Sequence, residues 1–148
     1  MESKTLTYSQ LFLRIAVSIS FLSAVADRLG LWGAPGDAGV AWGNWENFVS
    51  YSNSVNSFVS PGIGNILAVI ATSLEIIIPV LLLVGFKLRL TALASGTLLL
   101  CFALAMTVSF GIKPSLDYSV WTAAAGCFLL SVIPSYRYSI DNLLLNRK

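Results

Sequence analysis

The sequence predicts an all-α membrane protein, a bundle of four transmembrane helices with both termini in the cytoplasm. Hydrophobic residues make up 56% of the 148 residues and charged residues only 11%. An average soluble domain carries about 25% charged residues, so this chain has too few polar side chains to cover a surface in water. Its apolar residues also form long uninterrupted runs, without the alternation of a transmembrane β-strand. We therefore expect one membrane domain over residues 1–148.

Four apolar runs predict the four helices. They cover residues 6–29, 63–84, 88–110 and 116–133. A helix needs about 20 apolar residues to cross the hydrocarbon core of a bilayer. The first three runs meet this length, and the fourth is near its lower limit. The runs leave a long outer loop at 30–62, a tight turn at 85–87 and a tail at 134–148.

The distribution of basic residues predicts the orientation, because loops that remain in the cytoplasm are enriched in Lys and Arg. With four spans, one side holds Lys4, Lys87, Arg89, Arg137, Arg147 and Lys148, and the other side holds Arg28 and Lys113. We therefore expect a multi-pass protein of the inner (cytoplasmic) membrane. Residues 15–26 also fit a secretory signal, but Arg14 interrupts the apolar region that such a signal needs, and we expect the segment to be retained.

The outer loop contains three of the four tryptophans, Trp32, Trp42 and Trp45. In residues 44–60, apolar residues recur at helical spacings with polar residues between them. This pattern is typical of an amphipathic helix lying in the membrane interface, where tryptophan side chains are favoured. We expect the three tryptophans to be the anchors of this loop.

Two apolar runs each contain one isolated charge, Arg14 in the first and Glu75 in the second. An ionisable group inside a bilayer is costly and usually has a partner. From a rise of about 1.5 Å per residue, Arg14 should lie roughly 12 Å and Glu75 roughly 14 Å from the same membrane surface. We therefore predict that these two side chains form a buried ion pair.

Small polar residues accompany this predicted pair. Thr72 and Pro79 share one face of the second helix with Glu75, while Ser95 and Thr122 provide facing polar groups on the third and fourth helices. Two interpretations remain open for this polar centre in the cytoplasmic half of the bundle. The ion pair locks the helices together, or the centre is a pocket for a small or amphipathic ligand. The adjacent charges of Asp27 and Arg28, at the end of the first helix, are typical of solvated residues.

Several kinds of site are excluded or disfavoured by composition. The chain has no histidine, and its two cysteines, Cys101 and Cys127, form neither a CxxC pair nor a zinc-binding spacing. We therefore expect no metal site. Scattered basic residues and a net charge of +2 give no indication of nucleic-acid binding. No motif for flavin, haem or an iron–sulfur cluster is recognisable.

Three segments carry a resemblance to a known family. The run at 13–22, the stretch at 72–76 with the basic turn at 83–89, and the loop at 41–48 with 116–119 resemble the DoxX family of small four-helix membrane proteins. Members of this family are linked to oxidoreductase systems, including a thiosulfate:quinone oxidoreductase, and relatives with a cysteine pair are linked to disulfide chemistry. The resemblance therefore leaves a quinone as a candidate ligand, whereas the missing CxxC argues against a thiol relay.

Two functions follow as hypotheses. The first is a membrane subunit of a redox system that binds a quinone or another lipophile near Arg14 and Glu75, with a partner protein supplying the electron carrier. The second is a non-enzymatic accessory or assembly protein that acts through its tryptophan-rich outer loop. The lipid bilayer is the expected environment in both cases, and a homo-oligomer is compatible with either, because the sequence does not set the stoichiometry.

Overall fold

The computed structural model describes residues 4–145, and these residues form seven helices. The helices are α1 (Lys4–Arg28), α2 (Trp45–Val55), α3 (Pro61–Val84), α4 (Leu88–Phe110), α5 (Ile112–Asp117), α6 (Val120–Ser131) and α7 (Ile140–Leu145). Arg147 and Lys148, which contributed to the expected orientation, lie outside the described residues.

Three helices of the described chain are long and apolar enough to cross a membrane, namely α1, α3 and α4. They confirm the first three predicted helices as long and apolar enough to span. The fourth predicted span, 116–133, is wrong as a single helix. It is divided between α5 and α6 by Ser119, whose φ of 56° lies in the left-handed region. The 12 residues of α6 are about 18 Å long, which is shorter than the roughly 30 Å hydrocarbon core.

The predicted amphipathic helix of the outer loop exists as α2. Asn44 is its N-cap and accepts a 2.8 Å hydrogen bond from the backbone N–H of Asn47. This cap satisfies one of the donors that every helix leaves free in its first turn. Phe48, Ser52 and Val55 form the buried side of the helix. Pro61 is the first residue of α3, a position at which proline is favoured.

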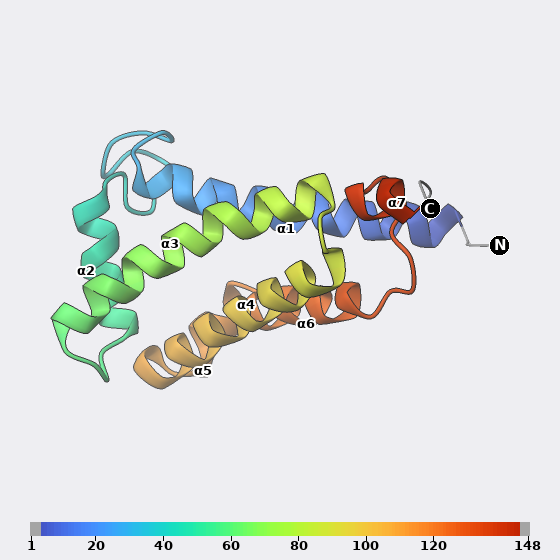
Figure 1. Ribbon diagram of the computed structural model, residues 1–148. Helices are drawn as coiled ribbons and strands as arrows, with labels where there is room; N and C mark the ends of the chain where they lie inside the picture. The colour runs from blue at the N-terminus through green and yellow to red at the C-terminus, as the bar shows by residue number, and fades with distance from the viewer. Residues whose placement is uncertain (1–3, 146–148) are drawn as a thin grey trace.

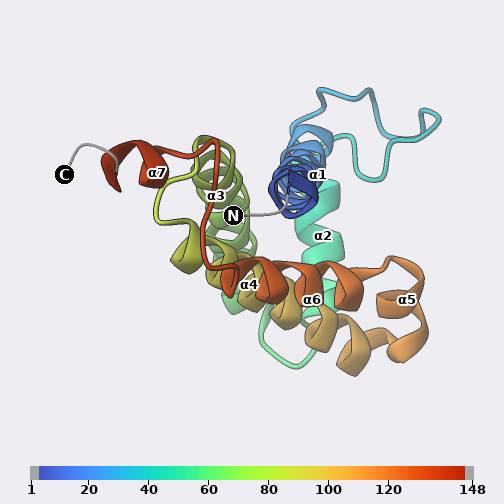
Figure 2. The same cartoon turned by 90° about the vertical axis from the view of Figure 1, so that its right-hand side faces the viewer.

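The long helices are arranged as two pairs (Figure 1). α1 packs along α3, and α4 packs along α6, so that the pairs meet near the α3–α4 turn and diverge towards α2. We call the end that contains this turn the turn end, and the end that contains residues 29–60 the loop end. α2 crosses the loop end between the two pairs (Figure 2), where Ser109 of α4 donates a 2.6 Å hydrogen bond to the carbonyl of Val55.

The apolar core lies where all four helices meet. It is formed by Val17 and Phe21 of α1, Ile78 and Leu82 of α3, Leu88 and Ala92 of α4, and Cys127 and Leu130 of α6. Small residues bring α4 and α6 together, as membrane helices require for close packing. At Gly96, for example, an added Cβ would lie only 2.9 Å from the ring of Phe128.

Candidate functional site

Glu75 forms its ion pair with Arg28, at the loop end of α1. Arg28 Nη1 lies 2.6 Å from Glu75 Oε2 and donates a second hydrogen bond, of 2.7 Å, to Thr72 Oγ1. The Thr72 hydroxyl in turn donates to the carbonyl of Ala68 within its own helix. Arg28 is only 2% exposed and Glu75 only 5%. A buried ion pair and a hydroxyl group therefore join α1 to α3. We call Arg28, Thr72 and Glu75 the charged cluster.

The predicted pair between Arg14 and Glu75 is wrong because the two helices are shifted along each other. The prediction assumed that residue 6 and residue 84 lie at one level. In the structure, Arg14 binds the carbonyls of Leu82 and Leu83, and Ser18 donates to the carbonyl of Pro79. Glu75 is therefore level with the part of α1 about two turns beyond Arg14, a separation of roughly 12 Å.

The direction of the side chains explains how Arg28 reaches Glu75. Side chains on a helix point towards the N-terminus of that helix. Since α1 and α3 are antiparallel (Figure 1), Arg28 and Glu75 point towards each other along the contact. Arg28 Nε also donates a 3.1 Å hydrogen bond to the carbonyl of Ala24, one turn earlier, which holds the guanidinium close to its own helix.

Aromatic side chains from the loop end cover the charged cluster. The Arg28 guanidinium carbon lies 3.8 Å from the centre of the Phe48 ring and 5.4 Å from that of Trp42. Cation–π contacts of this kind are strongest when the cation is desolvated. Trp42 also packs against Phe48 and Tyr51. Burial raises the pKa of Tyr51, with a further contribution from Tyr118, so Tyr51 remains a neutral phenol in this apolar cover.

Asp27 fixes the loop that carries Trp42. Its carboxylate accepts hydrogen bonds of 2.8, 2.9 and 3.0 Å from the backbone N–H groups of Ala41, Trp42 and Gly43. Asp27 is itself buried. The expectation that Asp27 and Arg28 are solvated is therefore wrong. Their position beside a tryptophan-rich loop is the sequence signal for burial, because such a loop can fold back over a helix end.

Arg14 instead caps the end of α3. Its side chain is 0% exposed and donates to four backbone carbonyls: Leu82 at 3.0 Å, Leu83 at 3.0 Å, Tyr138 at 3.1 Å and Arg137 at 3.4 Å. The last carbonyls of a helix have no partner within the helix and carry a partial negative charge. Arg14 supplies both the donors and the charge that this helix end requires.

The remaining residues of the predicted polar centre do not all join the charged cluster. Thr72 belongs to it, and Pro79 lies one turn away with its carbonyl bound by Ser18. Ser95 is buried but donates to the carbonyl of Thr91 in its own helix, and Thr122 is exposed. The structure thus places the polar centre between α1 and α3, without a contribution from α4 or α6.

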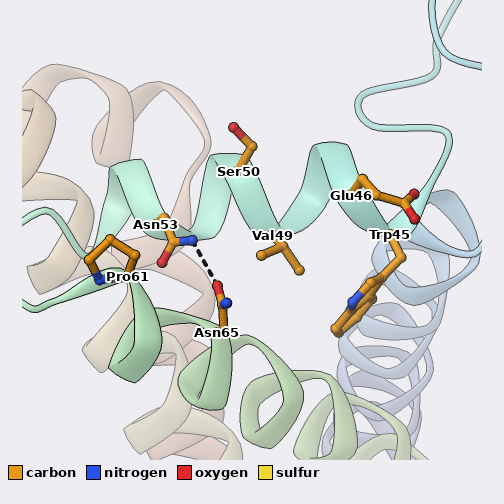
Figure 3. A pocket seen from close by; sticks show the side chains of 7 residues that line it. All are labelled: Trp45, Glu46, Val49, Ser50, Asn53, Pro61 and Asn65. Carbon is orange, nitrogen blue, oxygen red and sulfur yellow. Dashed lines mark hydrogen bonds between the residues drawn. The ribbon is translucent and has the colours of Figure 1, made fainter.

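The three predicted anchors differ in their surroundings. Trp32 is exposed, and its indole N–H donates to the backbone and the hydroxyl of Ser23 on α1. Trp42 covers Arg28, as described above. Trp45 packs against Phe48 and borders an open groove of about 470 Å³ between α2 and α3. The groove is lined by Trp45, Glu46, Val49, Ser50, Asn53, Pro61 and Asn65 (Figure 3).

The charged cluster has the chemistry to hold a polar head group. Arg28 Nη1 donates to Oε2 of Glu75, and within the described residues no hydrogen bond is accepted by Oε1. One carboxylate oxygen is thus available as an acceptor, beside the donors of Arg28 and Thr72. No group of three or more His, Cys, Asp or Glu in the described part of the chain is arranged to hold a metal ion.

The sequence model of the DoxX family matches residues 9–110. The chain belongs to the DoxX family. The matched range contains the charged cluster, Asp27 and Arg14, but not α5, α6 or α7. No curated protein and no solved structure matches the chain. The protein is thus a DoxX family integral membrane protein with a buried Arg28–Glu75 ion pair.

Proposed function

We propose that this DoxX protein binds a quinone or a similar lipophile at the charged cluster and serves as the membrane subunit of a redox system. The observation that carries the proposal is the buried Arg28–Glu75 pair with one carboxylate oxygen unused. A quinone carbonyl accepts hydrogen bonds, as from Arg28 or Thr72, and a quinol hydroxyl donates one, as to Glu75 Oε1. Donors and an acceptor at one place suit both forms of the ligand.

Access to the cluster requires a movement of its aromatic cover. Arg28 and Glu75 are almost fully buried, so a ligand reaches them when Phe48 and Trp42 move away with α2 and the preceding loop. α2 is suited to such a movement because it is a separate helix of 11 residues, joined to α1 and α3 by segments without regular structure. Electrons would come from a partner protein, because the described residues offer no metal cluster.

Tryptophan fluorescence tests the proposal, because quinones quench nearby indoles. The purified full chain in lipid nanodiscs is titrated with decylubiquinone, and we expect saturable quenching that Trp42→Phe largely removes. Glu75→Gln should weaken binding by at least about tenfold, the effect of losing a hydrogen bond to a charged group. Thr72→Val should weaken it by about three- to tenfold, the effect of a neutral hydrogen bond. Ser73→Ala, on the exposed side of α3, is the matched control.

Two results would remove the proposal. One is quenching that rises linearly with quinone and is equal in all variants, since this indicates partition into lipid alone. The other is unchanged affinity in Thr72→Val and Glu75→Gln variants that still unfold cooperatively. Thr72→Val keeps the shape of the side chain and preserves the ion pair, so it remains informative if Glu75→Gln does not fold.

Exposed apolar residues at the start of the outer loop, directly after α1, favour a second function. Leu31 is 75% exposed and Trp32 is 62% exposed. We propose, as the alternative, an accessory protein that holds another membrane protein through this part of the loop. A photo-cross-linker at Leu31 should then recover one defined protein from native membranes, and Trp32→Ser should abolish that adduct. Recovery of lipid alone would contradict the alternative.

A further inference from the structure

The groove between α2 and α3 contains side chains that the charged cluster does not use. Figure 3 shows Trp45 and Asn65 on opposite sides of this groove, with Val49 of α2 between them. Pro61, the first residue of α3, also lines the groove. Since α3 is long and apolar enough to span a membrane, the groove lies at the level where this helix enters the hydrocarbon.

Amide side chains fix one end of the groove. Asn53 Nδ2 donates a 2.9 Å hydrogen bond to Asn65 Oδ1, and this bond joins α2 to α3. The two helices approach closely here because Gly64 has no side chain: an added Cβ would lie only 1.9 Å from Asn53 Oδ1. Within the described residues, Asn65 Nδ2 makes no hydrogen bond. It is therefore available as a donor to an anionic group.

The other end of the groove is suited to a cation. Trp45 supplies an aromatic ring and Glu46 an exposed carboxylate, and both residues line the groove. Within the described residues, the basic side chains of the loop end, Arg28 and Lys113, are paired with other carboxylates. An ammonium group is attracted both by an aromatic face and by a carboxylate. This end of the groove therefore attracts a positive charge from outside the chain.

An exposed apolar surface continues from the groove along α3. Ile66, Val69 and Ile70 are all exposed. Asn65 and Val69 are four residues apart in a helix, so their side chains are neighbours on one face. A ligand that places a polar group at Asn65 can therefore extend an apolar chain along Val69, in the direction of the hydrocarbon core.

We propose that this groove binds the head group of phosphatidylethanolamine in the leaflet at the loop end. The ammonium lies against Trp45 and Glu46, the phosphate accepts a hydrogen bond from Asn65 Nδ2, and an acyl chain follows α3. A primary ammonium donates charge-assisted hydrogen bonds to a carboxylate, whereas a choline group has no N–H to donate. Phosphatidylglycerol has no cation for Glu46. The site should therefore prefer phosphatidylethanolamine to both of these lipids.

A lipid in this groove connects α2 to α3. It contacts α2 through Trp45 and Glu46, and α3 through Asn65. Trp45 also packs against Phe48, with 5.4 Å between the ring centres, and Phe48 covers Arg28. Binding should therefore slow the opening of α2, because a ligand stabilises the state to which it binds. Lipid binding at the groove requires no quinone, so it is tested separately from the proposed function.

Native mass spectrometry of the purified full chain in detergent micelles measures the binding of the three lipids with matched acyl chains. We expect phosphatidylethanolamine to bind most tightly. Glu46→Gln should weaken its binding by about three- to fivefold, as for an exposed ion pair. Trp45→Leu should weaken it by about two- to fivefold, as for an exposed cation–π contact, and the combined variant by about tenfold. Asp37→Asn, which removes another exposed carboxylate of the outer loop, is the matched control and should bind normally.

Hydrogen exchange of residues 45–55 gives a second measurement. Exchange should be slower in phosphatidylcholine nanodiscs that also contain phosphatidylethanolamine, and the combined variant should lose this difference. Equal binding of the three lipids, or equal binding by Glu46→Gln and Asp37→Asn, would overturn the proposal. The same protection of α2 by phosphoethanolamine without acyl chains would also overturn it, since the ligand would then be a soluble amine. Glu46→Gln changes an exposed side chain, so it remains informative if Trp45→Leu does not fold.

Discussion

Arg28 connects three helices, α1, α2 and α3, through one side chain. It pairs with Glu75, donates to Thr72, binds the carbonyl of Ala24 and lies under the ring of Phe48. A charge in so apolar a place is tolerated when its partners replace the lost water. The consequence is that each partner depends on Arg28, and Glu75 most of all, because it would otherwise be a buried carboxylate without a cation.

Arg28→Gln should therefore destabilise the protein by about 3–5 kcal/mol, the usual cost of leaving one member of a buried ion pair unpaired. The measurement is reversible unfolding of the reconstituted protein in urea or mixed micelles. Lys113→Gln is the control. It breaks the ion pair of Lys113 with Asp117, in which both side chains are largely exposed, and should have almost no effect. Equal losses of unfolding free energy in the two variants would show that the buried ion pair of Arg28 contributes no more to stability than the exposed pair of Lys113.

Single residues also show how far the sequence can predict this site. The need of Glu75 for a buried cation followed from its apolar surroundings, and that expectation is correct in kind. The prediction that Arg14 is this cation was wrong because it assumed that the ends of the two apolar runs lie at one level in the membrane. In the structure, α1 extends beyond the end of α3. Relative shifts between helices are set by packing contacts such as Ser18 with Pro79, and these are not visible in a hydropathy pattern.

Among the elements, the loop before α2 is fixed by Asp27. This loop carries Trp42, which covers Arg28. A carboxylate that accepts three backbone N–H groups fixes the path of residues 41–43. Asp37 offers a comparison within the same loop, because its carboxylate accepts a 2.8 Å hydrogen bond from the backbone N–H of Ala34 and its position is exposed.

Asp27→Ala should increase hydrogen exchange across residues 41–55, because the loop and then α2 lose their attachment to α1. Asp37→Ala should change exchange only near residues 34–40. Hydrogen exchange with mass spectrometry on the reconstituted protein measures both effects. Unchanged protection of α2 in Asp27→Ala would mean that α2 is held by its contacts with α3 and α4 alone.

The α3–α4 turn depends on Gly85 for two separate reasons. Its φ of 74° is in the left-handed region, and an added Cβ would overlap Ser139 and come within 2.8 Å of Arg14 Nη2. Gly85→Ala should therefore cost more than the roughly 1–3 kcal/mol of backbone strain alone. Gly39→Ala provides the comparison, since Gly39 also has a positive φ, of 82°, and open space around its Cα. Unfolding measurements that rank the two variants equally would contradict the close packing of Ser139 on the turn.

The elements also differ in how well the sequence predicts them. The apolar runs predicted α1, α3 and α4, and apolar residues at helical spacings predicted α2, because both signals depend on the local sequence. The break between α5 and α6 depends on tertiary contacts. Trp121 donates a 3.0 Å hydrogen bond to the buried hydroxyl of Ser115, which also bonds to Thr107 of α4. These contacts fold α5 back beside α4 and leave Ser119 in the turn.

At the scale of the whole molecule, the two helix pairs are joined differently at the turn end and at the loop end. Near the turn end they share one apolar core, and Arg14 and Asp141 tie the C-terminal segment to α3 and α4. Near the loop end the pairs diverge, and α2 connects them (Figure 1). The loop end is therefore connected between the pairs through α2, which suits the proposed ligand site, because that site must open for a ligand to enter.

The same architecture predicts where the ends of the chain lie. α1 begins and α7 lies at the turn end, while the loop of residues 29–44 lies at the other end (Figure 1). Three spanning helices alone would place the termini on opposite sides. Here α5 and α6 return the chain along α4, so residues 4 and 142 should face the same side of the membrane, the cytoplasm if the basic residues of the turn end determine orientation.

Cysteine labelling tests this arrangement. In a Cys101→Ala background, Lys4→Cys and Asn142→Cys should react with a membrane-impermeant maleimide only after the inner side of the membrane is opened, whereas Asp37→Cys should react in intact cells. All three positions lie outside the apolar segments, so labelling reports the side of the membrane. Reaction of Asn142→Cys from the same side as Asp37→Cys would show that the chain crosses the membrane three times and that α6 does not return it to the turn end.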